Sequence, residues 1–223
     1  SRPPPPAHTR RMSVSTWELT ARAFERRERW LYDPVQWVHD IINFGPNGNL
    51  VNYQAEVMNG LISRGRVAVR APHGTGKTGI VALTVLWFAT TRDQAGIDWK
   101  VITTASAWRQ LTLFAWPEIH KWARRIRWDA LGRGEFDSRR ELLDLHLKLS
   151  SGQAAAVASD DPARIEGAHA DSLLYVFDEA KTIPAGTWDA VEGAFAGGRK
   201  SGLPEAFALA MSTPGAPSGR FYE

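Results

Sequence analysis

Residues 66–80 read RVAVRAPHGTGKTGI, and this stretch decides the fold class. Apolar residues alternate from Val67 to Ala71, which predicts a buried strand that breaks at Pro72. A loop with two glycines follows, and the apolar run from Ile80 to Ala89 predicts a helix directly after it. Strand, glycine loop, Lys-Thr and helix is the order of a P-loop, in which backbone N–H groups and the helix N-terminus surround phosphate oxygens.

The loop supplies the candidate nucleotide-binding residues. Gly74 and Gly76 let backbone N–H groups point inward around phosphate. Lys77 is expected to reach the β- and γ-phosphates, and the Thr78 hydroxyl to hold Mg²⁺. The first position of the usual pattern is Ala71 here instead of glycine, so the match is to a relaxed form. The predicted phosphate-binding residues are Ala71, Pro72, His73, Gly74, Thr75, Gly76, Lys77 and Thr78.

Composition limits the class of protein. With 223 residues, 43% of them hydrophobic and 23% charged, the chain can bury one substantial α/β core. It has no cysteine, which excludes disulfides and cysteine-based metal sites and fits a reducing cytosol. The longest apolar run is too short to span a bilayer, so no membrane partner is expected. A net charge of +3 fits polyanion binding and a solvated basic surface equally well.

The first third of the chain predicts a small helical subdomain. Residues 1–13, with four consecutive prolines, suit a flexible leader, and residues 14–223 are expected to form one domain. Helices are predicted to start at the capping box of Ser15, at the N-cap Asp33 before a proline, and at Asn52.

Later segments predict the rest of a parallel sheet. The apolar runs at 99–104, 172–177 and 207–211 predict core strands. Alternating leucines at 143–149 predict a half-buried strand, which forms a hairpin with the strand after it. Residues 107–126 predict a helix that Pro117 kinks or splits.

The strand at 172–177 ends in Asp178-Glu179, a Walker B pattern. Asp178 is expected to bind Mg²⁺ through water, and Glu179 to orient and polarise an attacking water. Such a pair is weak alone and strong when a P-loop precedes it. At the tip of the next strand, Ser212, Thr213 and Pro214 either sense the γ-phosphate or simply make a turn.

Two other features have open alternatives. Gln54 lies upstream of the loop, and its amide matches the donor–acceptor edge of adenine, although an exposed helical glutamine is an equally good interpretation. The segment Lys121–Arg127 mixes four basic residues with Trp and Ile. It is either a nucleic-acid strip or, more often for such runs, the end of an amphipathic helix with its charges in water.

Together and in this order, the motifs resemble the ATPase domain of the large terminase subunit, the DNA-packaging motor of tailed bacteriophages. The resemblance implies an α/β, ASCE-type P-loop fold: a central, mostly parallel sheet flanked by helices, here with the N-terminal helical subdomain and the hairpin insertion. The stretches that carry it are Tyr53-Gln54, APHGTGKT (71–78), VITTASAWRQ (101–110), EGAHADSLLYVFDEA (166–180) and ALAMSTPGAPSGRFYE (208–223).

The resemblance also implies roles and partners. Gln54 matches the adenine-reading glutamine, Glu179 the catalytic glutamate, and 212–214 the motif that couples hydrolysis to movement. Lys77 and Thr78 match the ligands of ATP and Mg²⁺. The implied partners are double-stranded DNA, the small terminase subunit, and further copies of the chain in a ring, expected to be pentameric, on the capsid portal. The implied location is the cytoplasm of the host cell.

Three departures from the family pattern stand out. His73 occupies a place where several terminases have an arginine. Glu166 stands where many have the arginine that acts on a neighbouring subunit, so Arg164, the nearest arginine, is the candidate finger. A nuclease domain is expected after this ATPase domain in the full-length protein, and nuclease activity is therefore not expected from this chain.

Two rival functions share some of these features. A helicase-type ATPase of superfamily 2 has a similar loop, an upstream glutamine and a DE pair, but needs a second motor domain. A nucleotide-gated assembly scaffold would bind ATP without turnover, and Glu179 argues against it because pure binding needs no water-polarising carboxylate.

Overall fold

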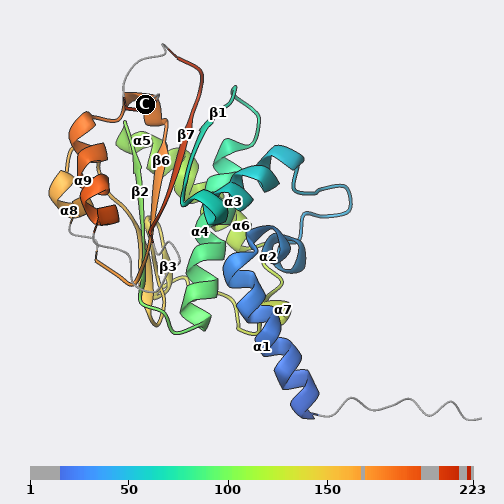
Figure 1. Ribbon diagram of the computed structural model, residues 1–223. Coiled ribbons are helices and arrows are strands. Elements are labelled where there is room, and N and C mark those ends of the chain that lie inside the picture. Colours follow the sequence, from blue (N-terminus) through green and yellow to red (C-terminus); the bar gives the residue numbers. More distant parts are fainter. Residues whose placement is uncertain (1–15, 167–168, 197–205, 216–219, 222–223) are drawn as a thin grey trace, which may run out of the picture.

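A computed structural model describes residues 16–166, 169–196, 206–215 and 220–221 (Figure 1). The predicted leader 1–13 and the capping-box residue Ser15 lie outside these ranges. Among the described residues, no helix combines the length and apolarity needed to cross a membrane.

In the described part of the chain, seven strands form one sheet in the order β1-β7-β6-β2-β5-β4-β3. Pairing is parallel from β1 to β5 in this order and antiparallel for β4 and β3. This is the mostly parallel sheet that the sequence predicted. The strands are β1 (Arg66–Arg70), β2 (Trp99–Ala105), β3 (Leu142–Leu143), β4 (His146–Lys148), β5 (Gly152–Ala156), β6 (Ser172–Asp178) and β7 (Ala206–Ser212).

Helices cover both faces of the sheet (Figure 1). They are α1 (Thr16–Tyr32), α2 (Pro34–Ile41), α3 (Asn52–Arg64), α4 (Lys77–Gln94), α5 (Trp108–Gln110), the π-helical turn η1 (Leu111–Ala115), α6 (Trp116–Ala123), α7 (Trp128–Leu131), α8 (Pro162–Glu166), the 3₁₀ turn η2 (Ala180–Thr182) and α9 (Ala185–Ala196). The core on one face joins α4 and α6 to Val101, Leu174 and Leu209, and the core on the other joins α8 and α9 to Tyr175 and Phe177. Residues of one strand thus alternate between two cores, which explains why β2 and β6 are apolar throughout.

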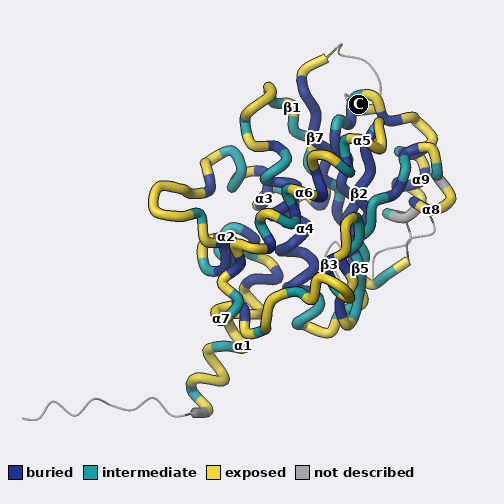
Figure 2. Tube along the Cα trace, turned by 180° about the vertical axis from the view of Figure 1, so that it is seen from behind, coloured by how far each residue is buried: buried dark blue, intermediate teal, exposed yellow. Residues whose placement is uncertain are grey.

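The N-terminal helices are held to α4 by tryptophans. The buried indole of Trp87 donates to the carbonyl oxygen of Trp30 at 2.6 Å, and the Trp30 indole donates to Asp40 Oδ2 at 2.8 Å. Asp33 caps α2 as predicted, accepting the backbone N–H of Gln36 at 2.8 Å. Figure 2 shows the central strands as buried, whereas the first turns of α1 extend away from the body as an exposed segment.

The structure corrects the prediction of a buried strand before the loop. β1 is an edge strand with β7 as its one neighbour in the sheet, and Arg66, Ala68 and Arg70 are exposed. Arginine side chains on a strand are costly to bury without partners, so β1 lies at an edge where these side chains reach water. Val67 and Val69 are only partly buried.

Two further predictions differ in detail. The alternating leucines at 143–149 do not form one strand: β3 and β4 pair with each other across a turn, with Leu142 opposite Leu147. The predicted hairpin is confirmed, because β4 pairs antiparallel with β5. The third helix is capped one residue earlier than predicted, since Val51 is the N-cap and Asn52 is already helical.

The predicted helix at 107–126 is split next to Pro117: α5 and η1 come before α6, which has Pro117 in its first turn and ends at Ala123. The missing N–H of Pro117 is accommodated by η1, in which the N–H of Trp116 donates to the carbonyl of Leu111, one residue further back than in an α-helix. Helix α9 was not predicted from the sequence at all.

The pairing of β5 with β2 can be tested by substituting one glycine. Gly152 lies opposite Trp99, and a Cβ atom added there would lie 2.1 Å from the Trp99 carbonyl oxygen. Gly152→Ala is therefore expected to lower the free energy of unfolding by about 3 kcal/mol, because the backbone must shift. Gly134→Ala is the matched control: a Cβ atom added at Gly134 would meet no atom within 4 Å, and a change within about 0.5 kcal/mol is expected. Similar urea midpoints for the two variants would contradict this register.

Candidate nucleotide-binding site

The loop between β1 and α4 has the backbone shape of a phosphate cradle. Gly74 and Gly76 have φ of +78° and +86°, in the left-handed region that favours glycine. A Cβ atom on Gly76 would also lie 2.8 Å from Gln54 Nε2. Thr75 Oγ1 donates to the carbonyl oxygen of Pro72 at 2.9 Å, which closes the loop on itself. The predicted glycine positions are thus the ones that the backbone requires.

Lys77 is the first residue of α4 and lies inside the loop. Its side chain is nearly buried, and Nζ donates to the carbonyl oxygens of Ala71 and Pro72 at 2.7 and 2.6 Å. An ammonium group has three N–H donors, and the third has no acceptor among the described residues. A nearly buried ammonium group with one unused N–H is suited to donate a hydrogen bond to a phosphate oxygen.

The two acidic residues lie at the end of β6. Asp178 is 6% exposed, and its Oδ1 accepts the N–H of Glu179 at 3.1 Å. Burial raises the pKa of Asp178 to about 6; the charge of Glu179 also raises it, while the hydrogen bond and the charge of Lys77 oppose the shift. The charge of Lys77 thus favours the ionised form of Asp178, but burial outweighs it.

Glu179 has an unusual backbone conformation. With φ of +48° and ψ of +49°, it is the one non-glycine residue of positive φ among those described. Such a conformation costs of the order of 1 kcal/mol or more and is typical of functional sites. The Glu179 side chain is partly exposed, and its Oε2 accepts the hydroxyl proton of Thr213 at 3.2 Å. The carboxylate is thus held by Thr213 while it stays accessible to solvent.

The tip of β7 joins the loop to the acidic pair. Because β7 lies between β1 and β6, its last residues lie beside the ends of both strands. The Ser212 carbonyl oxygen accepts the N–H of Ala71 at 3.0 Å, and Ser212 Oγ accepts the N–H of Lys181 at 3.3 Å. Ser212 and Thr213 are buried, whereas Pro214 is exposed. The structure thus brings together the predicted loop, the acidic pair and residues 212–214.

Gln54 contacts the loop but has other partners. Its Oε1 accepts the N–H of Val51 at 3.1 Å, and its Nε2 approaches the Gly76 carbonyl oxygen at 3.4 Å. Tyr53 donates its hydroxyl proton to the carbonyl oxygen of Thr75. The start of α3 therefore braces the loop, and adenine reading by Gln54 stays a prediction. This bracing role of Tyr53 was not predicted, although the residue was part of the motif.

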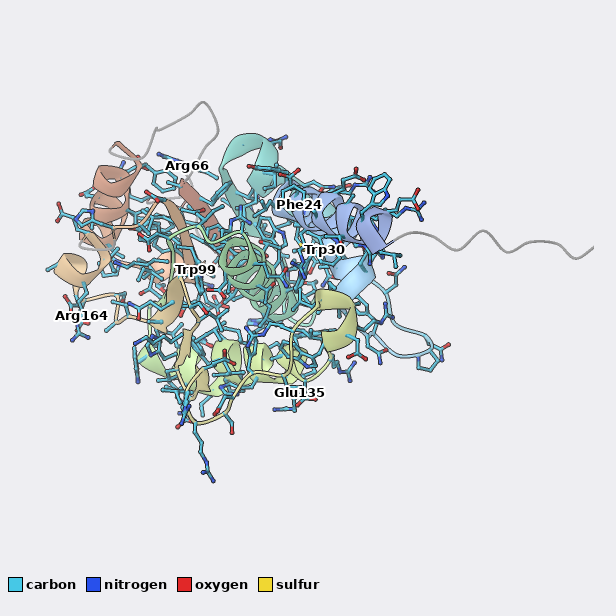
Figure 3. The ribbon with its side chains drawn as sticks, turned by 90° about the horizontal axis from the view of Figure 1, so that it is seen from below. Phe24, Trp30, Arg66, Trp99, Glu135 and Arg164 are labelled. Carbon is cyan, nitrogen blue, oxygen red and sulfur yellow. The ribbon has the colours of Figure 1, made fainter. Side chains whose placement is uncertain are left out.

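Two predicted residues lie apart from this cluster. The His73 side chain is exposed on the loop. Arg164 lies on α8, on the other face of the sheet from α4, with 77% of its side chain exposed and an ion pair to Asp161 at 3.4 Å. Figure 3 shows Arg164 at the rim of the molecule. Arg164 does not join the loop of its own chain, and its role as a finger for a neighbouring subunit stays a prediction.

Thr78 and Asp178, the two residues predicted to bind Mg²⁺, carry oxygen donors of the kind that this ion takes. In the described part of the chain, the Thr78 hydroxyl has no hydrogen bond, and no group of three or more His, Asp or Glu side chains converges on one point. Mg²⁺ commonly takes one or two protein oxygens and completes its shell with water and substrate phosphates. One hydroxyl and one carboxylate, from Thr78 and Asp178, match that number of protein oxygens.

The raised pKa predicts that Asp178 limits stability. An ionised carboxylate whose pKa rises on folding, from 3.8 to about 6, opposes folding by about 3 kcal/mol above pH 6. This penalty shrinks as the pH falls from 6 towards 4. Asp178→Asn is therefore expected to raise the free energy of unfolding of the nucleotide-free chain by about 1–3 kcal/mol at pH 8, less near pH 4, with part of the gain lost because Lys77 loses an opposite charge.

Urea unfolding at both pH values measures this difference. Asp171→Asn, an exposed carboxyl just before β6, is the control and should change stability little at either pH. A destabilised Asp178→Asn variant at pH 8 would show that the carboxylate is better compensated than its burial implies.

Comparison with known proteins places this geometry on a known fold. No protein-family model matches the chain, and a search of curated proteins finds no match. Among solved structures, the chain is similar to the large terminase ATPase domain of Thermus phage P74-26 (TM-score 0.54) and to a mutant of that domain (TM-score 0.55). Each is 18% identical, over 78% of this chain and 68% of the other. The chain thus has the ASCE-type P-loop fold of a large terminase ATPase domain, and the resemblance inferred from its motifs is confirmed at the level of the fold.

Proposed function

We propose that residues 14–223 form the ATP-hydrolysing motor domain of a viral large terminase, which moves double-stranded DNA into a procapsid. One observation carries the proposal. The loop 71–78, the pair Asp178-Glu179 and the tip 212–214 come from three adjacent strands and meet at one end of the sheet. The fold similarity to a large terminase ATPase domain supports the same function and does not favour the helicase alternative.

In this proposal the loop binds the phosphates of ATP. The N–H groups around Gly74 and Gly76 and the start of α4 face the phosphate oxygens, and Lys77 turns its free N–H towards the β- and γ-phosphates. Thr78 and Asp178 would hold Mg²⁺, Asp178 through water, and the ion would supply positive charge that offsets the charge of the phosphates. Gln54 is proposed to read adenine, for which its amide would exchange the partner Val51 for the base.

Glu179 is the proposed catalytic carboxylate. Its side chain is partly exposed, so its oxygens could orient a water for in-line attack on the γ-phosphate and accept a proton from it. The hydroxyl of Thr213 holds one of these oxygens in place. Residues 212–214 are therefore well placed to report the state of the site to the chain that follows β7, the coupling role proposed for them.

The remaining partners follow from the terminase proposal. The chain would work in a ring of copies, proposed to be pentameric, on the capsid portal in the host cytoplasm, with the small terminase subunit as a further partner. Arg164, at the rim of one subunit, would reach the site of the next. A nuclease domain is proposed to follow residue 223 in the full-length protein.

The first test measures Mg²⁺-dependent phosphate release against protein concentration. The rate per chain is expected to rise with concentration, because a neighbour completes the site. Glu179→Ala is expected to lower it by about 10²-fold or more, and Lys77→Ala to abolish it. Lys148→Ala, an exposed lysine on β4, is the matched control. Hydrolysis by Lys77→Ala at the unsubstituted rate would refute the proposal.

Mixing two inactive variants tests the trans role of Arg164. Arg164→Ala and Glu179→Ala should each be nearly inactive, since a finger in trans contributes about 10³–10⁵ in rate. A mixture should regain activity, because some sites then combine an intact Glu179 with an intact Arg164 from the neighbour. Arg140→Ala, an exposed arginine elsewhere, should hydrolyse ATP normally. A mixture no more active than its components would remove Arg164 from the site.

A further inference from the structure

We propose that Lys181 is a positioning residue for Glu179, and that it acts through the hydroxyl of Thr213. This inference deepens the proposed function and rests on it, because it assumes that Glu179 orients the attacking water. Lys181 was not singled out in the sequence and has no part in the roles assigned above.

The turn after β6 brings Lys181 back to β7. Glu179, in its left-handed conformation, is the N-cap of η2, and its carbonyl oxygen accepts the N–H of Thr182 at 3.4 Å. The N–H of Lys181 donates to Ser212 Oγ at 3.3 Å. The side chain then reaches past Ser212, and Nζ donates to Thr213 Oγ1 at 2.7 Å. Lys181 is thus bonded to β7 through both its backbone and its side chain.

These contacts fix the direction of the Thr213 hydroxyl. A hydroxyl has one proton to donate and lone pairs to accept with, whereas an ammonium group can only donate. Because Lys181 Nζ donates to Oγ1, the Thr213 proton must point elsewhere, and Glu179 Oε2 is the acceptor at 3.2 Å. Among the described residues, the chain of bonds therefore runs in one direction, from Lys181 through Thr213 to Glu179.

The charge of Lys181 strengthens this arrangement. A hydrogen bond from a cation polarises the hydroxyl that accepts it and makes its O–H a better donor. In the described structure, no carboxylate forms an ion pair with Lys181, and its other acceptor is the Pro214 carbonyl oxygen at 3.5 Å. Thr213 is 5% exposed, so water cannot readily replace the ammonium group as its partner. Without Lys181 the hydroxyl could rotate, and Glu179 would lose a fixed donor.

A double-mutant cycle on turnover tests this chain of bonds. Lys181→Met is expected to lower kcat about 10- to 100-fold, the cost of a misplaced catalytic group, with KM for ATP within about two-fold. Thr213→Val should have a similar effect. The double variant should be no slower than Thr213→Val alone, because both changes break the same path. Lys181→Arg, which keeps a charged donor, should recover most of kcat, and Lys148→Met should change nothing.

A second measurement needs no turnover. In nucleotide-free protein labelled at the lysine side-chain nitrogens, the Lys181 ammonium should give an NMR signal protected from solvent exchange. Thr213→Val should remove that signal, whereas Thr213→Ser should keep it. The signal reports the Lys181–Thr213 hydrogen bond even if Lys181→Met folds poorly. In that case kcat is compared between the unsubstituted protein and the Lys181→Arg and Thr213→Ser variants.

The outcomes separate this inference from the proposed function. Turnover that survives Lys77→Ala or Glu179→Ala would remove the ATPase proposal itself. If those variants are inactive, then normal kcat in Lys181→Met, or additive losses in the double variant, would overturn the role of Lys181. A loss confined to ATP affinity, measured with a non-hydrolysable analogue and Mg²⁺, would also overturn it, because Lys181 would then contact nucleotide directly.

Discussion

The position of β7 between β1 and β6 is the constraint on which the site depends. Parallel pairing brings the carboxyl ends of these strands to one edge, where Ser212 bonds to the backbone on both sides: it accepts the N–H of Ala71 through its carbonyl and the N–H of Lys181 through its hydroxyl. One strand, β7, therefore separates the phosphate loop from the acidic turn, and the two hydrogen bonds of Ser212 fix their distance. A site defined in this way is as rigid as the sheet itself, which suits chemistry that needs fixed distances.

The same packing leaves the site with an unfavourable charge. Lys77 and Asp178 are both nearly buried, and their attraction offsets only part of the cost of removing the carboxylate from water, so the pKa of Asp178 rises. A cation that binds beside Asp178 would relieve this cost, and its binding free energy would then stabilise the fold. The burial of the Asp178 carboxylate would thus both lower the stability of the nucleotide-free chain and raise its affinity for the metal–nucleotide complex.

The sequence predicted those parts of the fold that depend on local patterns. The runs that became β2, β6 and β7 are apolar because helices cover both sheet faces, and the glycines of the loop are fixed by their own backbone angles. The edge position of β1 depends on which strand pairs with it, and β7 is more than 130 residues away in the chain. The contacts of Lys181 with Thr213 likewise join residues 32 apart. No local pattern in one sequence carries that information.

The role proposed for Lys181 has a consequence for coupling. Its ammonium group donates to Thr213, which holds Glu179, and to the carbonyl oxygen of Pro214, two residues past the end of β7. A movement of the segment after Pro214 would shift one of these acceptors relative to the other and so change how firmly Glu179 is held. Linkage then works in both directions: a change at Glu179 on phosphate release would alter the position that the segment prefers. One lysine would thus connect the carboxylate proposed as catalytic to the chain that follows β7.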